Sequence, residues 1–530
     1  MRGAETVLFL VVVATVVATF AHRLRVPSPS LLVVAGLLVG LLPGVPLVEV
    51  TPDIVSLVVL PPLLYVAGEE LPWRELRRVW QPVTALAVGL VLATAAAVGA
   101  VVVALTDLPI GMALVLGTVL ASTDPVAVTA LGRRLSLPPR VQTLVQAESL
   151  FNDATSLLLF RVAITAAVTA GGLSVGSTVG EFALLAGGGT VVGLVVAGGV
   201  TLIRRRTEDP VLETVIFLVT PYAAYVLAES LHGSGVTAVV VAAVVLGTQS
   251  TRLSSARIRL QLDAVSRTVV FLLESVVFGL IGLELPTLLR ELTVTSTWWP
   301  LQALAITATL VVIRVLWVFP LAALRRRRAG GGRPAWAVPT VVSWAGARGV
   351  VPLAAALSIP LTAADGKPLA GRDLVLLLSA AVIVITLVVQ GFTLAPLVRR
   401  AGIAVPPADL RQEYAQARIR LVRKGIEHLD ELSDLELAPE VVLTQLRDRM
   451  TARLGRIEAD DLLAGPDTGR PAAEPTAAAY QQVRRELVAV QNTELNQLYA
   501  DGAISDTTRR GLQRALDLED AGIADDHGHS

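Results

Sequence analysis

Long apolar stretches separated by short polar connections fill the first 400 residues of the chain. A bilayer-spanning helix needs about 20 predominantly apolar residues, so these stretches predict about thirteen spans. Their expected bounds are 5–21, 30–46, 53–68, 82–105, 110–131, 141–170, 178–203, 211–230, 234–249, 266–287, 298–323, 336–360 and 372–396. Hydrophobic residues make up 53% of the chain and its mean hydropathy is +0.66, far above the values of a soluble domain. The pattern therefore predicts an all-α, multi-pass membrane protein.

Basic residues are distributed unevenly between the connections. The connections after odd-numbered spans carry most of the arginines, whereas those after even-numbered spans contain only Arg290, Lys367 and Arg372. Because cytoplasmic connections are enriched in Lys and Arg, this alternation predicts an N-terminus outside the cell membrane and a cytoplasmic C-terminus. It also supports the number of spans, since one missed span would scramble the alternation.

The chain changes character near residue 400. After two consecutive prolines it is rich in charged residues, with helical periodicity over 410–432 and 480–498 and a linker containing Gly and Pro between them. These changes predict a membrane domain over 1–400 and a soluble, helical cytoplasmic tail over 401–530. Two interpretations of the tail remain open: it pairs with a second copy or reports on the cytosol, or it is a solvated appendage without a regulatory task.

The sixth span carries an unexpected polar stripe. Glu148, Ser149, Asn152 and Asp153 lie within an otherwise apolar stretch, and residues three or four positions apart share a face of a helix. A carboxylate at the centre of a bilayer costs roughly 3 kcal/mol on insertion scales, so two carboxylates require a compensating role. That role is most often ion or proton handling, and the stripe is therefore the predicted functional site.

Two further spans contain signals for broken helices. Pro125 follows Asp124 in the fifth span, and glycines flank Arg348 in the twelfth. Proline cannot continue a helix normally, so Asp124 is expected at the start of a half-helix. Arg348 at membrane depth needs a counter-charge from a buried acid. A local kink and an arginine that snorkels to the interface are the simpler alternatives. The two spans run in opposite directions, as in inverted repeats whose ion sites lie between half-helix ends.

Several chemistries lack support in the sequence. It contains no cysteine, which excludes disulfides and Cys-bound metals, and its five histidines show no ligand spacing within the spans. It has no Walker A loop, GxSxG or HExxH motif, so ATP is not expected, and neither is a cofactor or nucleic acid. An aromatic content of 4% disfavours a symporter of organic solutes. A cation channel remains the alternative from another functional class.

The ordered motifs resemble a known family. Thr123-Asp124-Pro125, the stretch 148–153 and Gly346-Ala347-Arg348-Gly349 are similar to signature elements of bacterial sodium/proton antiporters. These antiporters belong to the monovalent cation–proton antiporter group, which also includes the animal sodium/proton exchangers. The resemblance covers the membrane part of the chain. It implies a homodimer with a dimer domain and a mobile core domain, and exchange of Na+ for H+ in pH and sodium homeostasis, with Li+ or K+ as further candidate ions.

The resemblance also implies roles for individual residues. Asp153 would be the carboxylate that binds the ion and releases the proton, and Ser149 and the backbone near Thr123 would be further Na+ ligands. Asn152 would stabilise the site through hydrogen bonds, and Asp124 is expected in the same ion and proton site. An Asn-Asp pair, in place of the Asp-Asp pair of the electrogenic branch, implies one-for-one electroneutral exchange.

Arginines within apolar spans require partners. By the same resemblance, Glu148 and Arg348 would form a buried ion pair that ties two helices of the core domain together. Arg161 and Arg314 are assigned to structural ion pairs or helix packing, without a named partner.

One departure from the family pattern concerns the third span. Many relatives carry an acidic residue after the aromatic residue of this span, where the present chain has Tyr65-Val66. Whether Glu69 or Glu70 substitutes for that residue stays open. The choice between Na+ and K+, and hence the alternative of a K+/H+ antiporter, stays open with it.

Overall fold

The computed structural model describes most of the apolar part of the chain. The described residues are 28–41, 55–71, 73–124, 137–169, 175–207, 209–253, 256–291, 298–328, 336–362 and 368–403, together with scattered residues near the N-terminus and between 419 and 455. The chain divides into two compact units, Met1–Val405 and Pro406–Ser530. The fold below is that of the first unit, and the expected division into membrane domain and cytoplasmic tail stays a prediction.

The described part of the first unit is almost entirely helical, and its one bridge of extended chain joins Thr362 to Pro368. Its α-helices and two π-helical stretches are α2 (Ser28–Gly40), η1 (Val55–Val59), α4 (Leu60–Glu69), α5 (Trp73–Thr84), η2 (Ala85–Leu90), α6 (Val91–Leu105), α7 (Ile110–Val119), α9 (Pro139–Thr169), α10 (Val175–Arg204), α11 (Pro210–Ser230), α12 (Gly235–Leu253), α13 (Ala256–Glu291), α14 (Trp299–Arg328), α15 (Ala337–Trp344), α16 (Val350–Leu357) and α17 (Arg372–Ala401).

These helices confirm the predicted all-α membrane architecture. Every expected span from 30–46 onward overlaps a described helix, whereas the span 5–21 lies mostly outside the described residues. Within the described part, seven helices are long and apolar enough to cross a membrane, and shorter apolar helices accompany them. The number of thirteen spans stays a prediction.

Local sequence signals explain where individual helices begin and end. Asp209 precedes α11, and its Oδ1 accepts the backbone N–H of Val211 at 2.7 Å. Pro210 occupies the first helical position, where its missing N–H is not needed. Later in the chain, α17 ends before Gly402, whose φ of 62° lies in the left-handed region that glycine tolerates.

The structure interrupts the helices of the fifth and twelfth spans where the sequence predicts breaks. The twelfth span consists of α15 and α16, separated by the irregular segment 345–349. In the fifth span, α7 ends at Val119 and the chain is not helical over 121–124. The second half of that span, 125–136, lies outside the described residues. The described parts thus agree with two interrupted helices, as expected from the proline and the glycines.

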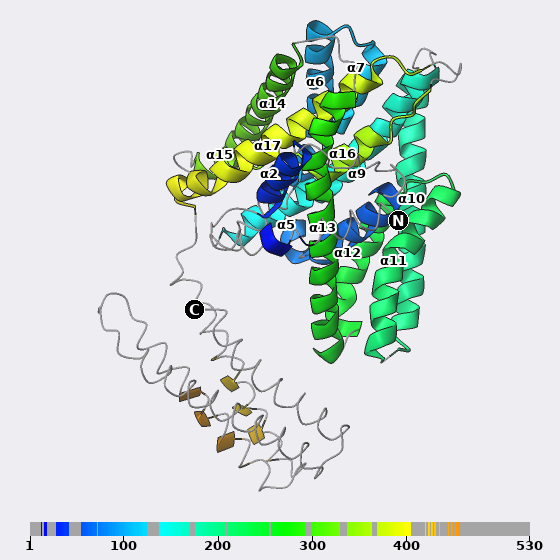
Figure 1. Cartoon of the computed structure of the whole chain (residues 1–530). Coiled ribbons are helices and arrows are strands. Elements are labelled where there is room, and N and C mark those ends of the chain that lie inside the picture. The colour runs from blue at the N-terminus through cyan, green and yellow to red at the C-terminus, as the bar shows by residue number, and fades with distance from the viewer. Residues whose placement is uncertain are drawn as a thin grey trace, which may run out of the picture. The chain divides into compact units, whose positions relative to one another are not determined.

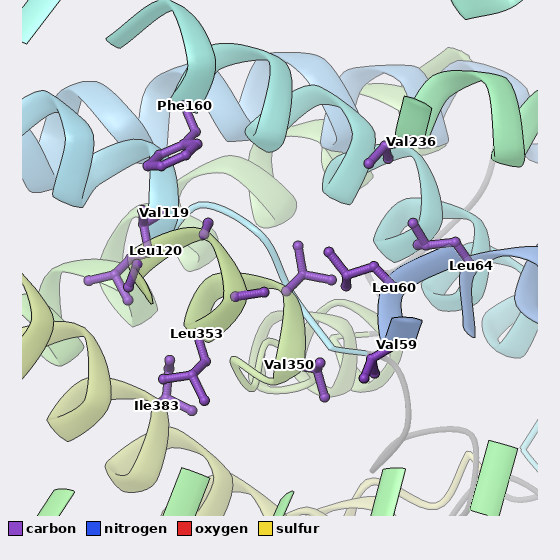
Figure 2. Close-up of a cluster of buried hydrophobic side chains, with 14 of the residues drawn as sticks. Val59, Leu60, Leu64, Val119, Leu120, Phe160, Val236, Val350, Leu353 and Ile383 are labelled. Atoms are coloured by element: carbon purple, nitrogen blue, oxygen red, sulfur yellow. The ribbon is translucent and has the colours of Figure 1, made fainter. Parts of the chain in front are cut away.

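Most of the described helices fall into two groups, whereas α2, α13 and α17 contact one another. One group, called here the α9 bundle, contains α5, α6, α7, α9, α14, α15 and α16. The other, the α12 bundle, contains α4, α10, α11 and α12. Figure 1 shows α6, α7 and α14 on one side and α10 and α11 on the other. The largest apolar core contains residues of both groups, and Figure 2 shows Leu64, Leu120, Phe160, Val236 and Leu353 among its side chains.

Small residues permit the closest helix contact. Gly36 of α2 lies against the backbone of Gly279 in α13, and Gly282 of α13 lies against the backbone of Val33. A Cβ atom at either glycine would overlap these backbone atoms. Membrane helices use such small residues because close approach of the backbones maximises van der Waals contact where the hydrophobic effect does not act.

Candidate ion-binding site

The two helix breaks meet at one point in the structure. The backbone N–H of Asp124 donates to the carbonyl of Ala347 at 2.8 Å. The Nε of Arg348 donates to the carbonyl of Leu120, just beyond the end of α7, at 2.7 Å. The carboxylate of Asp124 lies against Gly349, the residue before α16, because a Cβ at Gly349 would overlap it. The two interrupted spans therefore cross with their irregular segments in contact.

This crossing places each charged side chain at a helix end of the opposite charge. The last carbonyls of a helix carry partial negative charge and its first N–H groups carry partial positive charge. Arg348 lies at the carboxyl end of α7, and Asp124 lies at the amino end of α16. Each interrupted span thus supplies the charge that stabilises a half-helix of the other span.

The polar stripe of α9 lies against the break in the fifth span. The hydroxyl of Ser149 donates to the carbonyl of Thr123 at 2.5 Å. The Nδ2 of Asn152 donates to the hydroxyl of Thr123 at 3.2 Å. The hydroxyl of Ser122 donates to Oδ1 of Asp153. All five side chains are buried. Thr123, Ser149, Asn152 and Asp153, which were expected at the site from the sequence, therefore lie in one cluster that Ser122 joins. The carboxylate of Asp124, also expected there, lies against Gly349.

The oxygen atoms of this cluster suit an alkali cation. Asp153 offers a carboxylate whose described hydrogen-bond donor is a single hydroxyl. Oδ1 of Asn152 is buried and accepts no hydrogen bond, and an unsatisfied buried acceptor is costly unless something occupies it. Carboxylate, amide, hydroxyl and carbonyl oxygens are hard ligands, which prefer hard cations. Among the described residues no group of three His, Cys, Asp or Glu side chains forms a conventional metal site.

Glu148 is paired with a different arginine from the one expected. Nη1 and Nη2 of Arg314 donate to the two carboxylate oxygens of Glu148 at 2.5 and 2.9 Å. Both side chains are buried, with exposed fractions of 3% and 1%. Arg314 also donates to the carbonyl of Val342 at 3.0 Å, near the end of α15. The expected ion pair between Glu148 and Arg348 is therefore wrong, because Arg348 is engaged by carbonyl groups at the crossing.

Arg161 connects the two bundles. Its Nη2 lies 2.6 Å from Oε1 of Glu229, near the end of α11. The same oxygen of Glu229 accepts the backbone N–H of Gly235 at the start of α12, at 2.9 Å. The partner that the sequence left unnamed is thus Glu229, and the pair joins α9 to the α12 bundle.

Glu69 and Glu70 lie at the end of α4. Gly247 of α12 packs against the backbone of Glu69, and Tyr65 is fully buried edge-on against Phe217 with ring centroids 5.4 Å apart. The end of α4 is therefore built into the α12 bundle. In the described part of the chain, no hydrogen bond joins either glutamate to the cluster around Asp153.

Residues 10–400 match a family model described as sodium/hydrogen exchanger, transmembrane. The chain belongs to this family. An uncharacterized Na(+)/H(+) exchanger of Mycobacterium tuberculosis is 34% identical over 99% of this chain and 96% of that protein. A sodium, potassium, lithium and rubidium/H(+) antiporter of Bacillus pumilus is 31% identical over 77% of this chain and 62% of that protein.

Solved structures of exchangers share the fold. The sodium proton antiporter MjNhaP1 of Methanocaldococcus jannaschii at pH 8 has a TM-score of 0.63 and 21% identity, covering 76% of this chain and 99% of that one. Membership of the sodium/hydrogen exchanger family and this likeness confirm the family resemblance and the multi-pass helical architecture expected from the sequence.

Proposed function

We propose that the protein is a secondary antiporter that exchanges Na+ for H+ at the carboxylate of Asp153. The observation that carries this proposal is the environment of that carboxylate: it is buried among oxygen ligands at the crossing of two broken helices, with one hydroxyl donor and no arginine in its hydrogen bonds. Membership of the sodium/hydrogen exchanger family supports the same activity, as does the similarity to the sodium, potassium, lithium and rubidium/H(+) antiporter of Bacillus pumilus.

Competition at one carboxylate couples the two ions. A proton on Asp153 removes the charge that attracts Na+, and Na+ held by Asp153 excludes the proton. The other Na+ ligands in this proposal are the hydroxyl of Ser149, the carbonyl of Thr123 and Oδ1 of Asn152, the buried acceptor without a hydrogen bond. An empty, charged carboxylate is expensive at membrane depth. The site therefore changes its exposure from one side of the membrane to the other only when one ion occupies it.

The stoichiometry in this proposal is one Na+ for one H+. Asn152 occupies the position beside Asp153 at which a second titratable carboxylate would add a second proton. Asp124 lies against the start of α16, where we assign it to stabilising the half-helix. One titrating carboxylate then carries one charge in each direction, and the exchange is electroneutral.

The proposed setting is a homodimer in the cell membrane, with the N-terminus outside and the C-terminus in the cytoplasm. The arginine-rich connections after odd-numbered spans support this orientation. K+/H+ exchange is the second candidate, because the relative from Bacillus pumilus is named for potassium as well as sodium.

The test uses purified protein in liposomes that contain a pH-sensitive dye. A proton gradient is imposed across the liposome membrane. Na+, Li+ and K+ are then added in turn at two fixed membrane voltages. We expect Na+ to dissipate the gradient at the same rate at both voltages, and Asp153→Asn to abolish the response. Asp263→Asn is the matched control, because Asp263 lies in an exposed ion pair with Arg267 and should leave exchange unchanged.

Each alternative result has a defined meaning. Exchange retained by a folded Asp153→Asn protein would refute the site. A rate that changes with voltage would refute the one-for-one stoichiometry. A response to K+ alone would replace Na+ by K+ as the transported ion, and cation flux without proton movement would establish a channel instead.

A further inference from the structure

A cavity of about 640 Å³ lies between the α9 bundle and the α12 bundle. It is lined by α5, η2 and α9 on one side and by α10 and α12 on the other, including Phe151 and Leu158 of α9 and Phe182 of α10. Its volume falls within the range of about 300–1,000 Å³ that is typical of sites for small organic ligands. It is separate from the oxygen cluster around Asp153, which the lining residues do not include.

The lining of this cavity indicates an apolar occupant. Three hydroxyl groups reach it, and each donates a hydrogen bond within its own helix or helix start: Thr84 to the carbonyl of Trp80, Thr155 to that of Phe151, and Thr237 to the hydroxyl of Ser234. They therefore leave no donor directed at a polar ligand. The remaining lining residues are apolar or aromatic, with the single exception of Arg77.

One edge of the cavity has the chemistry of a membrane–water interface. Trp73, Arg77 and Trp80 follow one another on one face of α5, and the two tryptophans are 47% and 58% exposed. Arg77 is exposed, and the ion pairs found among the described side chains do not include it. Tryptophan prefers the level of lipid headgroups, and arginine binds phosphate oxygens. The first turns of α5 themselves carry the arginines of the connection after the third span, and the distribution of basic residues predicts that this connection faces the cytoplasm.

We propose that this cavity binds an anionic phospholipid of the cytoplasmic leaflet, with an acyl chain between α9 and α10 and the phosphate at Arg77. The commitment to an anionic lipid rests on charge complementarity, since Arg77 is the only charged group of the lining. The commitment to an acyl chain rests on the apolar walls that extend from α5 to Phe182.

Such a lipid would contact the helix that carries the ion site. Phe151, Ala154, Thr155 and Leu158 line the cavity from α9, at the helical spacings that define one face of the helix. Asp153 belongs to the same two turns of α9. Because α10 forms the opposite wall, an acyl chain in the cavity would contact both bundles at once. The lipid therefore modulates exchange, a consequence that rests on the proposed function, whereas the binding itself does not.

The first test measures binding without transport. The full-length protein is stripped of lipid in detergent, and phosphatidylglycerol or phosphatidylcholine with identical acyl chains is titrated while bound lipid is counted by native mass spectrometry. We expect phosphatidylglycerol to bind more tightly, and Arg77→Gln to remove about a fivefold preference, the factor expected for one arginine at an anionic surface. Arg325→Gln is the control, because Arg325 is exposed at the end of α14 and lines no part of the cavity.

A second variant tests the cavity itself. Ala186 lines the cavity from α10, and Ala186→Leu should fill part of it and reduce the binding of both lipids. Equal binding of the two lipids by the wild type, or a preference that survives Arg77→Gln, would refute the assignment of the headgroup. Undiminished binding to a folded Ala186→Leu protein would refute the cavity as the site. None of these results depends on whether the protein exchanges Na+ for H+.

Discussion

The buried ion pair between Glu148 and Arg314 allows a quantitative prediction of protein stability. Both side chains are buried, and two charge-assisted hydrogen bonds of 2.5 and 2.9 Å join them. Removing one partner of a buried pair leaves an uncompensated charge, which typically costs about 3–5 kcal/mol. Arg314→Met should therefore lower the free energy of unfolding by an amount of that order. Glu148→Gln should do the same, because it leaves the guanidinium of Arg314 without its counter-charge.

A double-mutant cycle distinguishes Arg314 from Arg348. Both arginines also hold backbone carbonyls, so either single substitution should be destabilising and cannot identify the partner of Glu148. Directly contacting residues show interaction energies of about 0.5–3 kcal/mol in such cycles. We expect Glu148→Gln and Arg314→Met to couple near the upper end of that range. Glu148→Gln and Arg348→Met should couple much more weakly.

Unfolding in detergent, followed by intrinsic tryptophan fluorescence, measures these differences. Arg267→Met is the control, because Arg267 and Asp263 form an exposed pair at 2.9 Å, for which about 0–1 kcal/mol is expected. Strictly additive effects of Glu148→Gln and Arg314→Met would refute the reasoning. A stronger coupling of Glu148 to Arg348 would restore the pairing first expected from the sequence.

Two further predictions concern close contacts. Gly349→Ala should lower both folded yield and exchange, because its Cβ would overlap the carboxylate of Asp124, whereas Gly198→Ala in open space on α10 should not. Equal behaviour of the two variants in size-exclusion and liposome assays would count against the packing of the crossing. Arg161→Gln should change the free energy of unfolding by at most about 1 kcal/mol, because its pair with Glu229 is partly exposed. A loss of several kcal/mol on thermal unfolding would show that this pair is more than a surface interaction.

Much of the fold follows from features that are local in the sequence. Apolar length predicts the membrane helices because the bilayer thickness is fixed. Pro125 and the glycines around Arg348 predict the breaks because they act on the adjacent backbone. The helix starts were less well predicted. The span expected from 82 continues a helix that begins at Trp73, and the one expected from 266 begins at Ala256. Polar first turns can extend a helix beyond the bilayer, so the length of the apolar stretch alone does not predict where such a helix begins.

The pairing of charges was not predictable in the same way. The sequence places Arg161, Arg314 and Arg348 within apolar spans, but depth alone does not say which acid each arginine meets. That choice depends on which helices are neighbours, and α14 reaches Glu148 only through the tertiary fold. Ser122 was missed for a related reason. Its hydroxyl reaches Asp153 only because the chain leaves the helix at the break.

The engagement of other buried charges supports the proposal that Asp153 is the carboxylate that binds the mobile ion. Both carboxylate oxygens of Glu148 accept a hydrogen bond from Arg314. Arg348 holds the end of α7 through Leu120, and releasing it to neutralise Asp153 would leave carbonyls of the crossing without a donor. Among the described residues, the carboxylate of Asp153 therefore accepts a hydrogen bond from the hydroxyl of Ser122 and not from an arginine. A buried carboxylate in that position requires a proton or a bound cation. In the proposed mechanism, the arginines that stabilise the broken helices thereby leave Asp153 available to exchangeable ions.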